Sequence, residues 1–486
     1  MKSYKTLLFL LSIFLLLGII WIFFPKNDLN INGLKLRFPS YSKATTPDTT
    51  TKIDVDSVLQ HVQESFVMTC TESQLDTLNY FHNFLTKNPN RIYLPNNNYQ
   101  YFDTLFQLFE QSDSTNTTYR IMHYGDSQIE LDRISSLLRE NFQTLFSGSG
   151  VGMIPAIQKI PSVSVSQKTS GAFTRYIIYG DSSTLRASHS RYGVMGHFSS
   201  LSGKGTISFK TTKHSYAQNK VKMISRISLL IGNNSENFTA TLQCDTFPSI
   251  RKNCNAKNGV SLLTWDFPCN IQKGTLLLDG TAEIYAILLD GENGIALDNN
   301  PLRGCSGTIF TKIDKETMRQ AFSLLNTRLI ILQFGGNRMP SITNATTINA
   351  YTKQIERQIA YFKEVAPKAK LLFIGPSDMG KSVNGTITTW PKLPELNDSL
   401  KSVTLRNNIA YWDMFNVMGG ENSMVRWVQH QPPYATSDYI HFTHHGANEI
   451  GKILSKSFET YYNFYKLRKI LPNDSVINFI KNDTIK

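Results

Sequence analysis

The pattern of apolar and polar residues begins with a long apolar run. Leu7 to Phe24 contains eighteen residues without a charge, and lysines stand before it at positions 2 and 5. A helix rises about 1.5 Å per residue, so this run roughly matches a hydrocarbon core about 30 Å thick. The positive-inside rule then keeps the N-terminus in the cytoplasm. We expect residues 1–26 to form a cytoplasmic tail and a membrane anchor. A cleaved signal peptide is the alternative, although no small-residue cleavage site follows Phe24.

The pattern then changes from a polar segment to a helical and a mixed one. Residues 27–55 are expected to form a stalk, because Ser40–Thr51 is rich in Ser, Thr and Pro and cannot bury a core. Residues 56–162 first show apolar residues at helical spacing. A buried strand is then predicted at residues 119–124 and a helix at residues 129–142. A strand followed at once by a helix is typical of the opening unit of a parallel α/β sheet.

Residues 163–298 have a different pattern, because short strand-like segments alternate with Gly, Asn and Ser turns and long helical patterns are missing. This predicts an all-β sandwich, jelly-roll-like, inserted into the α/β domain. Strands are expected at residues 162–166, 174–179, 205–211, 222–231, 238–243, 274–278 and 282–288.

The α/β pattern returns over residues 299–470, the second part of the same domain. Strands are predicted at residues 328–334, 370–374 and 409–412, and helices at residues 346–364 and 447–465. Residues 471–486 are expected to form a C-terminal tail.

Composition adds three constraints. The chain has 486 residues, 41% of them hydrophobic, which excludes a wholly disordered chain. Its net charge of +13 favours anionic partners such as membrane surfaces or acidic polymers, and the absence of long Lys/Arg runs argues against nucleic acid. Five cysteines exclude a disulfide scaffold. In an exported protein a local bridge between Cys244 and Cys254 is plausible.

A serine stands where the first predicted strand meets the first helix, in Gly125-Asp126-Ser127. Its hydroxyl would project from the carboxyl end of the sheet, where open α/β sheets bind ligands. Its N–H would lie at a helix N-terminus, where partial positive charge favours an oxyanion. Gly125 allows a tight turn. The alternative is structural, with Ser127 as a helix cap and Asp126 as a turn residue.

A second constellation precedes the last helix, where Asp438 stands three residues before His441. The carboxylate of Asp438 can accept a hydrogen bond from the ring Nδ1–H of His441, which leaves Nε2 free to take a serine proton. A metal site at His441, His444 and His445 is the alternative. No carboxylate or cysteine ligand has suitable spacing, so neither a metal nor another cofactor is expected.

Two glycine-rich turns lie near predicted strand ends, at residues 304–307 and 335–337. Acyl transfer through a serine forms a tetrahedral oxyanion that needs preorganised donors. The backbone N–H of Gly307 and the side-chain amide of Asn337 are candidates, with the N–H of Ser127 as a third.

This ordered set resembles the SGNH (GDSL-type) hydrolases. The blocks that match are Gly125-Asp126-Ser127, Gly307, Gly335-x-Asn337 and Asp438-x-x-His441. The resemblance implies a flavodoxin-like, three-layer α/β/α fold. It also implies Ser127 as nucleophile, His441 as general base and acid, Asp438 as its orienter, Ser127, Gly307 and Asn337 as oxyanion donors, and Gly125, Asp126 and Gly335 as nearby support. The third block often continues with Asp, and here Arg338 follows Asn337.

A narrower resemblance is to bacterial peptidoglycan O-acetylesterases and their O-acetyltransferase relatives. It rests on the β-type insert and on the stretch from Trp412 to Thr443, and it implies that the insert is similar to a carbohydrate-binding module. The function expected first is an esterase that removes O-acetyl groups from a cell-envelope glycan. The expected location is the bacterial inner membrane, single-pass, with the catalytic part facing the periplasm or the cell exterior.

Two alternatives remain open. One is an O-acetyltransferase that uses the same triad, with a membrane-bound O-acyltransferase as acyl-donor partner. The other is a non-catalytic glycan-binding envelope protein. The sequence does not distinguish the first from an esterase, because both share the step that acylates the serine.

Overall fold

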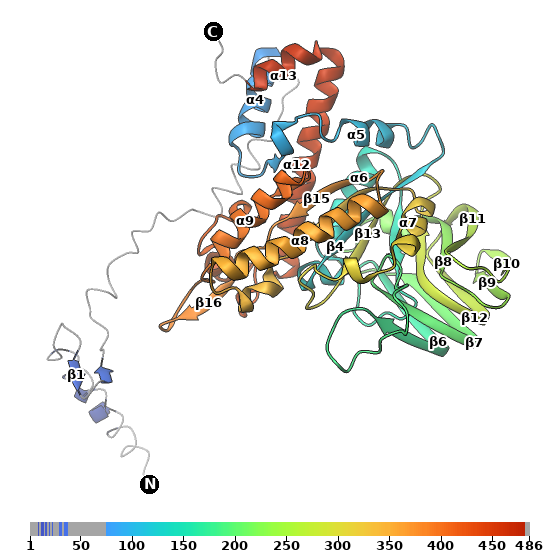
Figure 1. Cartoon of the computed structure of the whole chain (residues 1–486), viewed down its shortest axis with the longest axis horizontal. Coiled ribbons are helices and arrows are strands. Elements are labelled where there is room, and N and C mark those ends of the chain that lie inside the picture. Colours follow the sequence, from blue (N-terminus) through green and yellow to red (C-terminus); the bar gives the residue numbers. More distant parts are fainter. Residues whose placement is uncertain are drawn as a thin grey trace. The chain divides into compact units, whose positions relative to one another are not determined.

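The computed structural model describes residues 74–481 without a gap, together with positions 8, 11–13, 15, 16, 19, 22, 29–31 and 34–36. Residues 1–57 and 58–486 form two separate compact units (Figure 1). In the first unit, the described positions from 8 to 22 are helical, and β1 (Leu29–Ile31) pairs with β2 (Leu34–Leu36) in antiparallel fashion.

The predicted anchor lies only partly within these described positions. Among them, no helix has both the length and the apolar character that a membrane crossing requires. Much of Leu7–Phe24, and most of the predicted stalk at residues 27–55, lies outside the described residues, so both stay predictions.

A six-stranded sheet forms the centre of the larger unit (Figure 1). Its strands, in spatial order, are β13 (Gly294–Pro301), β4 (Thr118–Gly125), β14 (Thr327–Gln333), β15 (Lys370–Ile374), β18 (Ala410–Trp412) and β3 (Ile92–Tyr93). The first five are parallel, and β3 is antiparallel at the edge. Numbered along the chain, the parallel strands follow the order 2-1-3-4-5, which is the flavodoxin-like order. The predicted α/β fold is therefore confirmed.

Helices cover this sheet. α7 (Lys315–Leu324), α8 (Ala345–Val365) and α9 (Leu393–Arg406) pack side by side, and α6 (Ser135–Leu145) packs on α12 (His444–Ile470). Ile330 and Leu332 of β14 belong to the core that also contains residues of α7, α8 and α9. The intervening residues of a strand face the opposite side, and β14 is buried along its length.

Three further helices lie around the C-terminal half of α12. α4 (Gln74–Lys87) contacts α13 (Asn473–Lys481), and both α13 and α5 (Asp103–Glu110) contact α12. The expectation of a tail at residues 471–486 is therefore wrong for residues 473–481. Val476 and Ile480 are buried, and this gives α13 an apolar face that needs a partner.

The predicted β insert is present, but as one sheet rather than two. Its strands are β5 (Gly150–Ile154), β6 (Val165–Ile177), β7 (His197–Thr211), β8 (Ile224–Ile231), β9 (Phe238–Cys244), β10 (Phe247–Cys254), β11 (Ser261–Ile271) and β12 (Lys273–Asp290). The first half of β12 pairs with β7 and β9, and its second half pairs with β8 and β5. Because β12 is continuous, the two halves are joined and share one apolar core.

The limits of the insert also differ from the predicted residues 163 and 298. β5 precedes residue 163 and already pairs with β12, whereas β13 starts at Gly294 and pairs with β4 of the parallel sheet. Arg120 of β4 lies at this junction. Its guanidinium binds Asp298 of β13 at 2.6 Å and also Asp290 of β12. All three side chains are buried, so this ion-paired group connects the two sheets.

The plausible disulfide between Cys244 and Cys254 does not form. Both cysteines are free, as are Cys269 and Cys305. In the antiparallel hairpin of β9 and β10, Cys244 lies opposite Phe247 near the turn, whereas Cys254 lies opposite Phe238 at the other end. Cys70 lies outside the described residues.

Candidate active site

Ser127 lies at the carboxyl end of β4, as predicted, but the structure that follows it is not an α-helix. A short 3-10 segment spans Ser127–Asp132, with an extended residue at Glu130 and left-handed backbone at Leu131, and α6 begins at Ser135. The predicted helix at residues 129–142 therefore starts too early, and a helix macrodipole at Ser127 has no support. Asp126, rather than Ser127, is the cap, since its Oδ1 accepts a hydrogen bond from the Gln128 N–H at 3.0 Å.

Ser127, His441 and Asp438 form a continuous hydrogen-bonded chain. Ser127 Oγ lies 2.9 Å from His441 Nε2, and His441 Nδ1 lies 2.7 Å from Asp438 Oδ2. Ser127 and His441 are separated by 314 positions in the sequence, so only the fold brings them together. The arrangement has the geometry of a nucleophile, a base and an orienting carboxylate.

Asp438 is held by more donors than the histidine alone. Its Oδ1 accepts hydrogen bonds from the Thr436 hydroxyl at 2.6 Å and from the backbone N–H groups of Ile440 and His441 at 2.9 and 3.0 Å. Burial raises the pKa of Asp438, but the hydrogen bonds from His441, Thr436 and the backbone outweigh burial and hold this pKa well below its ordinary value. Asp438 is therefore ionised at neutral pH and can orient the imidazole.

Two side chains that sequence reasoning did not identify tie the histidine segment to the serine turn. Gln128 Nε2 donates to the carbonyl of Ile440 at 2.5 Å, and Gln128 Oε1 accepts from the N–H of Phe442 at 3.3 Å. Gln128 thus holds the backbone on both sides of His441. Arg133 donates to the carbonyl of Phe442 at 2.6 Å and to the carbonyl of Ser127 at 2.8 Å. A single sequence carries no signal for these contacts, because both connect segments distant in the chain.

Ser127 and His441 line a cavity of about 200 Å³ together with Asn337. Its other walls include Pro340, Met379 and Trp390, which give it a largely apolar surface. The Asn337 amide donates one hydrogen bond to the carbonyl of Cys305 at 3.3 Å, and an amide carries two N–H groups. The side chain of Asn337 also hydrogen-bonds the carboxylate of Asp126, which lines the same cavity.

Gly307 lies in the same neighbourhood without lining this cavity. It is buried, and its N–H donates to the sulfur of Cys305 at 3.3 Å. Its φ of +76° is accessible to glycine, and a Cβ there would lie 2.6 Å from the ring of Phe334. The structure therefore explains the glycine by packing, and its role as an oxyanion donor stays a prediction.

The three support residues are accounted for by close packing and burial. A Cβ on Gly125 would lie 3.0 Å from the side chain of Ile129, so space rather than turn geometry requires this glycine. Gly335 has φ of +140° and lies against Pro376. Asp126 is buried beside the cavity, and burial is the main cause that raises its pKa to about 6, opposed by the hydrogen bond from Gln128 and the charge of His441.

The three histidines of the 441–445 segment face different partners. His444 stacks on Tyr216 with ring centroids 5.0 Å apart, and His445 stacks on Tyr434 at 4.8 Å. Over the described part of the chain, no group of three or more His, Cys, Asp or Glu side chains is arranged to hold a metal ion. His441 alone of the three contacts the serine.

The fold is that of the SGNH (GDSL-type) α/β hydrolases, as the sequence motifs suggested. Residues 274–448 match the model of the GDSL-like Lipase/Acylhydrolase family. This range includes Asn337, Asp438 and His441 but starts after Ser127. The β insert explains this, because it separates the serine block from the other three.

Comparison with solved structures shows which proteins have a similar fold. A peptidoglycan O-acetylesterase structure matches with a TM-score of 0.60 and 19% identity, covering 75% of this chain and 96% of the other. At this identity the likeness concerns the fold. The match to a family two carbohydrate esterase from Cellvibrio japonicus covers 62% of this chain and 99% of the other at 11% identity. Its TM-score of 0.22 is too low to indicate a shared fold. A sequence search of curated proteins gives no match.

Proposed function

We propose that this protein is a serine esterase that removes O-acetyl groups from a cell-envelope glycan, peptidoglycan or a related polysaccharide. The observation that carries the proposal is the hydrogen-bonded chain from Ser127 through His441 to Asp438 at the mouth of a small cavity. The fold likeness to a peptidoglycan O-acetylesterase, which extends over the insert, supports the choice of substrate class.

The reaction follows from the positions of three atoms. Ser127 Oγ attacks the ester carbonyl while its proton passes to His441 Nε2, 2.9 Å away. The imidazolium that forms is stabilised by the carboxylate of Asp438 on its other nitrogen. His441 then gives the proton to the departing sugar oxygen, which leaves an acetyl group on Ser127. Water, deprotonated by His441, attacks this ester, and acetate leaves as the serine is restored.

The tetrahedral oxyanion needs donors on the cavity side of the serine. Asn337 is the side chain assigned to this role, since its amide lines the same cavity as Ser127. The cavity is about 200 Å³ and is lined by Pro340, Met379 and Trp390, and its small volume suits a short acyl group better than a fatty chain.

The location of the protein is part of the proposal. The uncharged run Leu7–Phe24, preceded by lysines, supports an anchor in the inner membrane with residues 27–486 outside the cytoplasm. A net charge of +13 suits an anionic glycan.

The test is hydrolysis of 4-nitrophenyl acetate and of O-acetylated peptidoglycan by the full-length chain in detergent. Ser127→Ala removes the nucleophile, so we expect turnover to fall by about 10³- to 10⁴-fold or more, with thermal unfolding unchanged. Ser170→Ala, at an exposed serine of β6, is the matched control and should keep full activity. Wild-type turnover in Ser127→Ala would refute the proposal.

A saccharide acceptor separates hydrolysis from transfer. With chito-oligosaccharide added, an esterase releases the same amount of acetate, because water resolves the acyl-enzyme. Acetylated oligosaccharide formed at the expense of acetate would instead identify an O-acetyltransferase. In that case the anchor would place the enzyme beside a membrane-bound O-acyltransferase as acyl donor.

A further inference from the structure

A second cavity, of about 330 Å³, lies where the insert meets the parallel sheet. The turn that carries Ser127 separates it from the catalytic cavity. Ser127 and Gln128, at the start of this turn, line the catalytic cavity, whereas Leu131 and Asp132, at its end, line the second one. A ligand in the second cavity would therefore contact the same short segment as the scissile ester.

The wall of the second cavity is mostly apolar. The insert contributes Ile154, Val165 and Ile177, and Met153 and Met195 complete this surface. Such a wall suits an aliphatic group and does not suit a fully hydrated polar ligand.

Arg175 of β6 gives this cavity an uncompensated positive charge. Its Nε is buried and has no hydrogen-bond partner, and within residues 74–481 no carboxylate lies within 4.0 Å of its guanidinium. Its neighbours are Tyr179 and His197. Burial lowers the pKa of His197 well below its ordinary value, and the charge of Arg175 lowers it further, so this histidine is neutral. The guanidinium of Arg175 is half-buried and hydrogen-bonds the neutral side chain of Tyr179, so its charge has no anionic partner, which makes an anionic ligand favourable.

The other arginines of the cavity are already neutralised. Arg139 forms two hydrogen bonds with Asp132, at 2.8 and 2.9 Å, and Arg303 forms two with Glu130, both at 2.6 Å. Of the three arginines that line the cavity, Arg175 is therefore the one without a carboxylate partner, and the remaining cation, Lys159, is exposed to solvent.

The cavity also holds an unused acceptor. Asn300 is 1% exposed, and its Oδ1 has no hydrogen-bond partner. A buried carbonyl oxygen of this kind favours a ligand that carries a hydroxyl or amide N–H. The cavity thus offers a cation, an acceptor and an aliphatic wall in one place.

We propose that the second cavity binds a carboxylate borne on a short aliphatic substituent of the glycan, with Arg175 as its partner and the apolar wall against the aliphatic group. This inference rests on the proposed function, which supplies the glycan as ligand. The second cavity would make the protein bind acidic acetylated sugars in preference to neutral ones. A carboxylate suits this site better than a free phosphate, which has no apolar part for the wall.

The test measures binding rather than turnover. Full-length Ser127→Ala is titrated with three disaccharides: N-acetylglucosaminyl-N-acetylmuramic acid, whose lactyl group carries a carboxylate, its methyl amide, and chitobiose. We expect the acid to bind about tenfold or more tightly than the amide or chitobiose, since a charge-assisted hydrogen bond accounts for such a factor.

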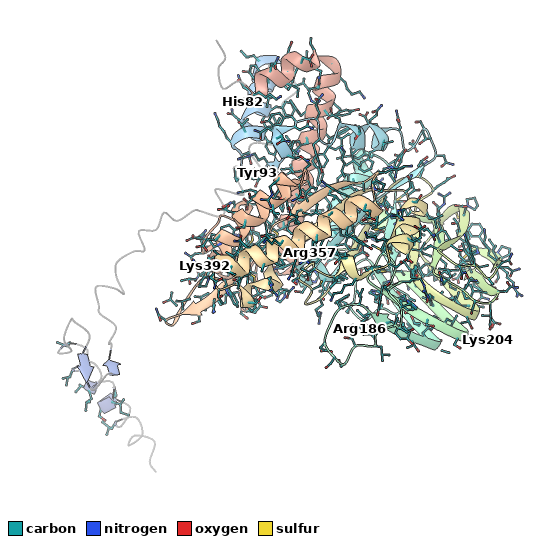
Figure 2. The ribbon with its side chains drawn as sticks, viewed as in Figure 1. His82, Tyr93, Arg186, Lys204, Arg357 and Lys392 are labelled. Atoms are coloured by element: carbon teal, nitrogen blue, oxygen red, sulfur yellow. The ribbon has the colours of Figure 1, made fainter. Side chains whose placement is uncertain are left out.

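Variants of Arg175 then assign the site. In the Ser127→Ala background, the additional substitution Arg175→Gln should remove the preference for the acidic disaccharide over its methyl amide. Arg175→Lys should keep part of this preference. Arg357→Gln is the control, because this exposed arginine of α8 lies in the hydrolase part and keeps the same charge change (Figure 2). Equal binding of acid and amide, or an unchanged preference in Arg175→Gln, overturns the proposal.

Two further arms keep the result decisive. In one arm, inorganic phosphate and acetate compete separately with the acidic disaccharide. If phosphate displaces the disaccharide as effectively as acetate does, the cavity is a general anion site, and the role of the aliphatic group is refuted. If circular dichroism shows that Arg175→Gln is unfolded, the acid-to-amide ratio of Arg175→Lys decides. Binding to Ser127→Ala is measured without turnover. The hydrolysis assay can therefore refute the esterase proposal, and the binding assay can refute this proposal, independently of each other.

Discussion

The parallel sheet and the sheet of the insert bury very different residues. Between residues 163 and 290 the buried side chains of Asp, Glu, Lys, Arg or His type are His197 and Asp290, and both belong to the side that meets the parallel sheet. The part of the chain around the parallel sheet buries many more, among them Arg120, Asp126 and Asp378. The insert's own core is apolar, with strand after strand alternating between buried and exposed positions.

This difference assigns the two parts separate tasks. The candidate catalytic groups lie at the carboxyl end of the parallel sheet, where Ser127 and Asn337 follow β4 and β14. The two buried charged or titratable side chains of the insert, His197 and Asp290, lie at a wall of the second cavity and in the ion-paired group of Arg120. The comparison therefore predicts that substitutions in the hydrolase site change the rate, whereas substitutions at the junction change stability or selectivity.

After Ser127 itself, the largest effect is expected at Asp438. In Asp438→Asn the side chain keeps its shape but loses the charge that orients and stabilises the imidazolium of His441, so kcat should fall by about 10³- to 10⁴-fold. Hydrolysis of 4-nitrophenyl acetate measures this. Asp266→Asn, at an exposed aspartate of the insert that pairs with Arg226, should leave kcat unchanged. A loss of less than tenfold in Asp438→Asn would contradict the assignment of this residue.

The junction itself should respond to Arg120. Arg120→Met leaves the buried carboxylates of Asp290 and Asp298 without their cation, and breaking one partner of a buried ion pair costs about 3 to 5 kcal/mol. Urea unfolding of the full-length chain measures the change. Arg319→Met removes an exposed ion pair on α7 and should cost less than about 1 kcal/mol. Similar losses in both variants would mean that the two sheets are not coupled through Arg120.

Asp126 gives a pH-dependent comparison. Its pKa is about 6 in the folded chain against 3.8 when unperturbed, so the folded state holds this proton more tightly. Its contribution to stability is full below about pH 4 and is lost as the pH rises through about 6. The stability of the wild type relative to Asp126→Asn should therefore fall over this range, by about 3 kcal/mol at most. Thermal unfolding at pH 4, 5, 6 and 7 measures the difference, and a difference that does not change with pH would contradict the raised pKa.

The sequence predicted much of this arrangement because its signals are local. The strand at residues 119–124 and the long helix at residues 346–364 appear close to their predicted limits, as β4 and α8. The serine, the histidine and the aspartate were identified from short motifs, and the structure brings them within hydrogen-bonding distance. Apolar periodicity and a motif of three or four residues depend on neighbouring positions alone, so they can be recognised without knowledge of the tertiary structure.

Features that depend on distant pairing were not predictable in this way. The helix after Ser127 is interrupted, because Asp126 caps a short turn and Leu131 adopts a left-handed conformation, which apolar periodicity does not reveal. Residues 274–278 and 282–288 were predicted as two strands, since Gly280 interrupts the pattern, but β7 pairs with β12 without a break from Lys273 to Ile284. Gln128 carries no motif at all, and its partners lie 312 and 314 positions away.

Gln128 therefore allows the last test, on a residue that only the structure reveals. Gln128→Ala removes the hydrogen bonds to Ile440 and Phe442, and the segment that presents His441 to Ser127 becomes less well fixed. Since small misplacement of a catalytic group is costly, kcat should fall by about 10- to 100-fold. Gln143→Ala is the matched control, because Gln143 is also buried but donates to the carbonyls of Gly150 and Ile295, away from the site. It should lower the unfolding temperature and leave kcat unchanged. If both variants lose activity alike, Gln128 acts through general stability, and the histidine segment needs no support from the serine turn.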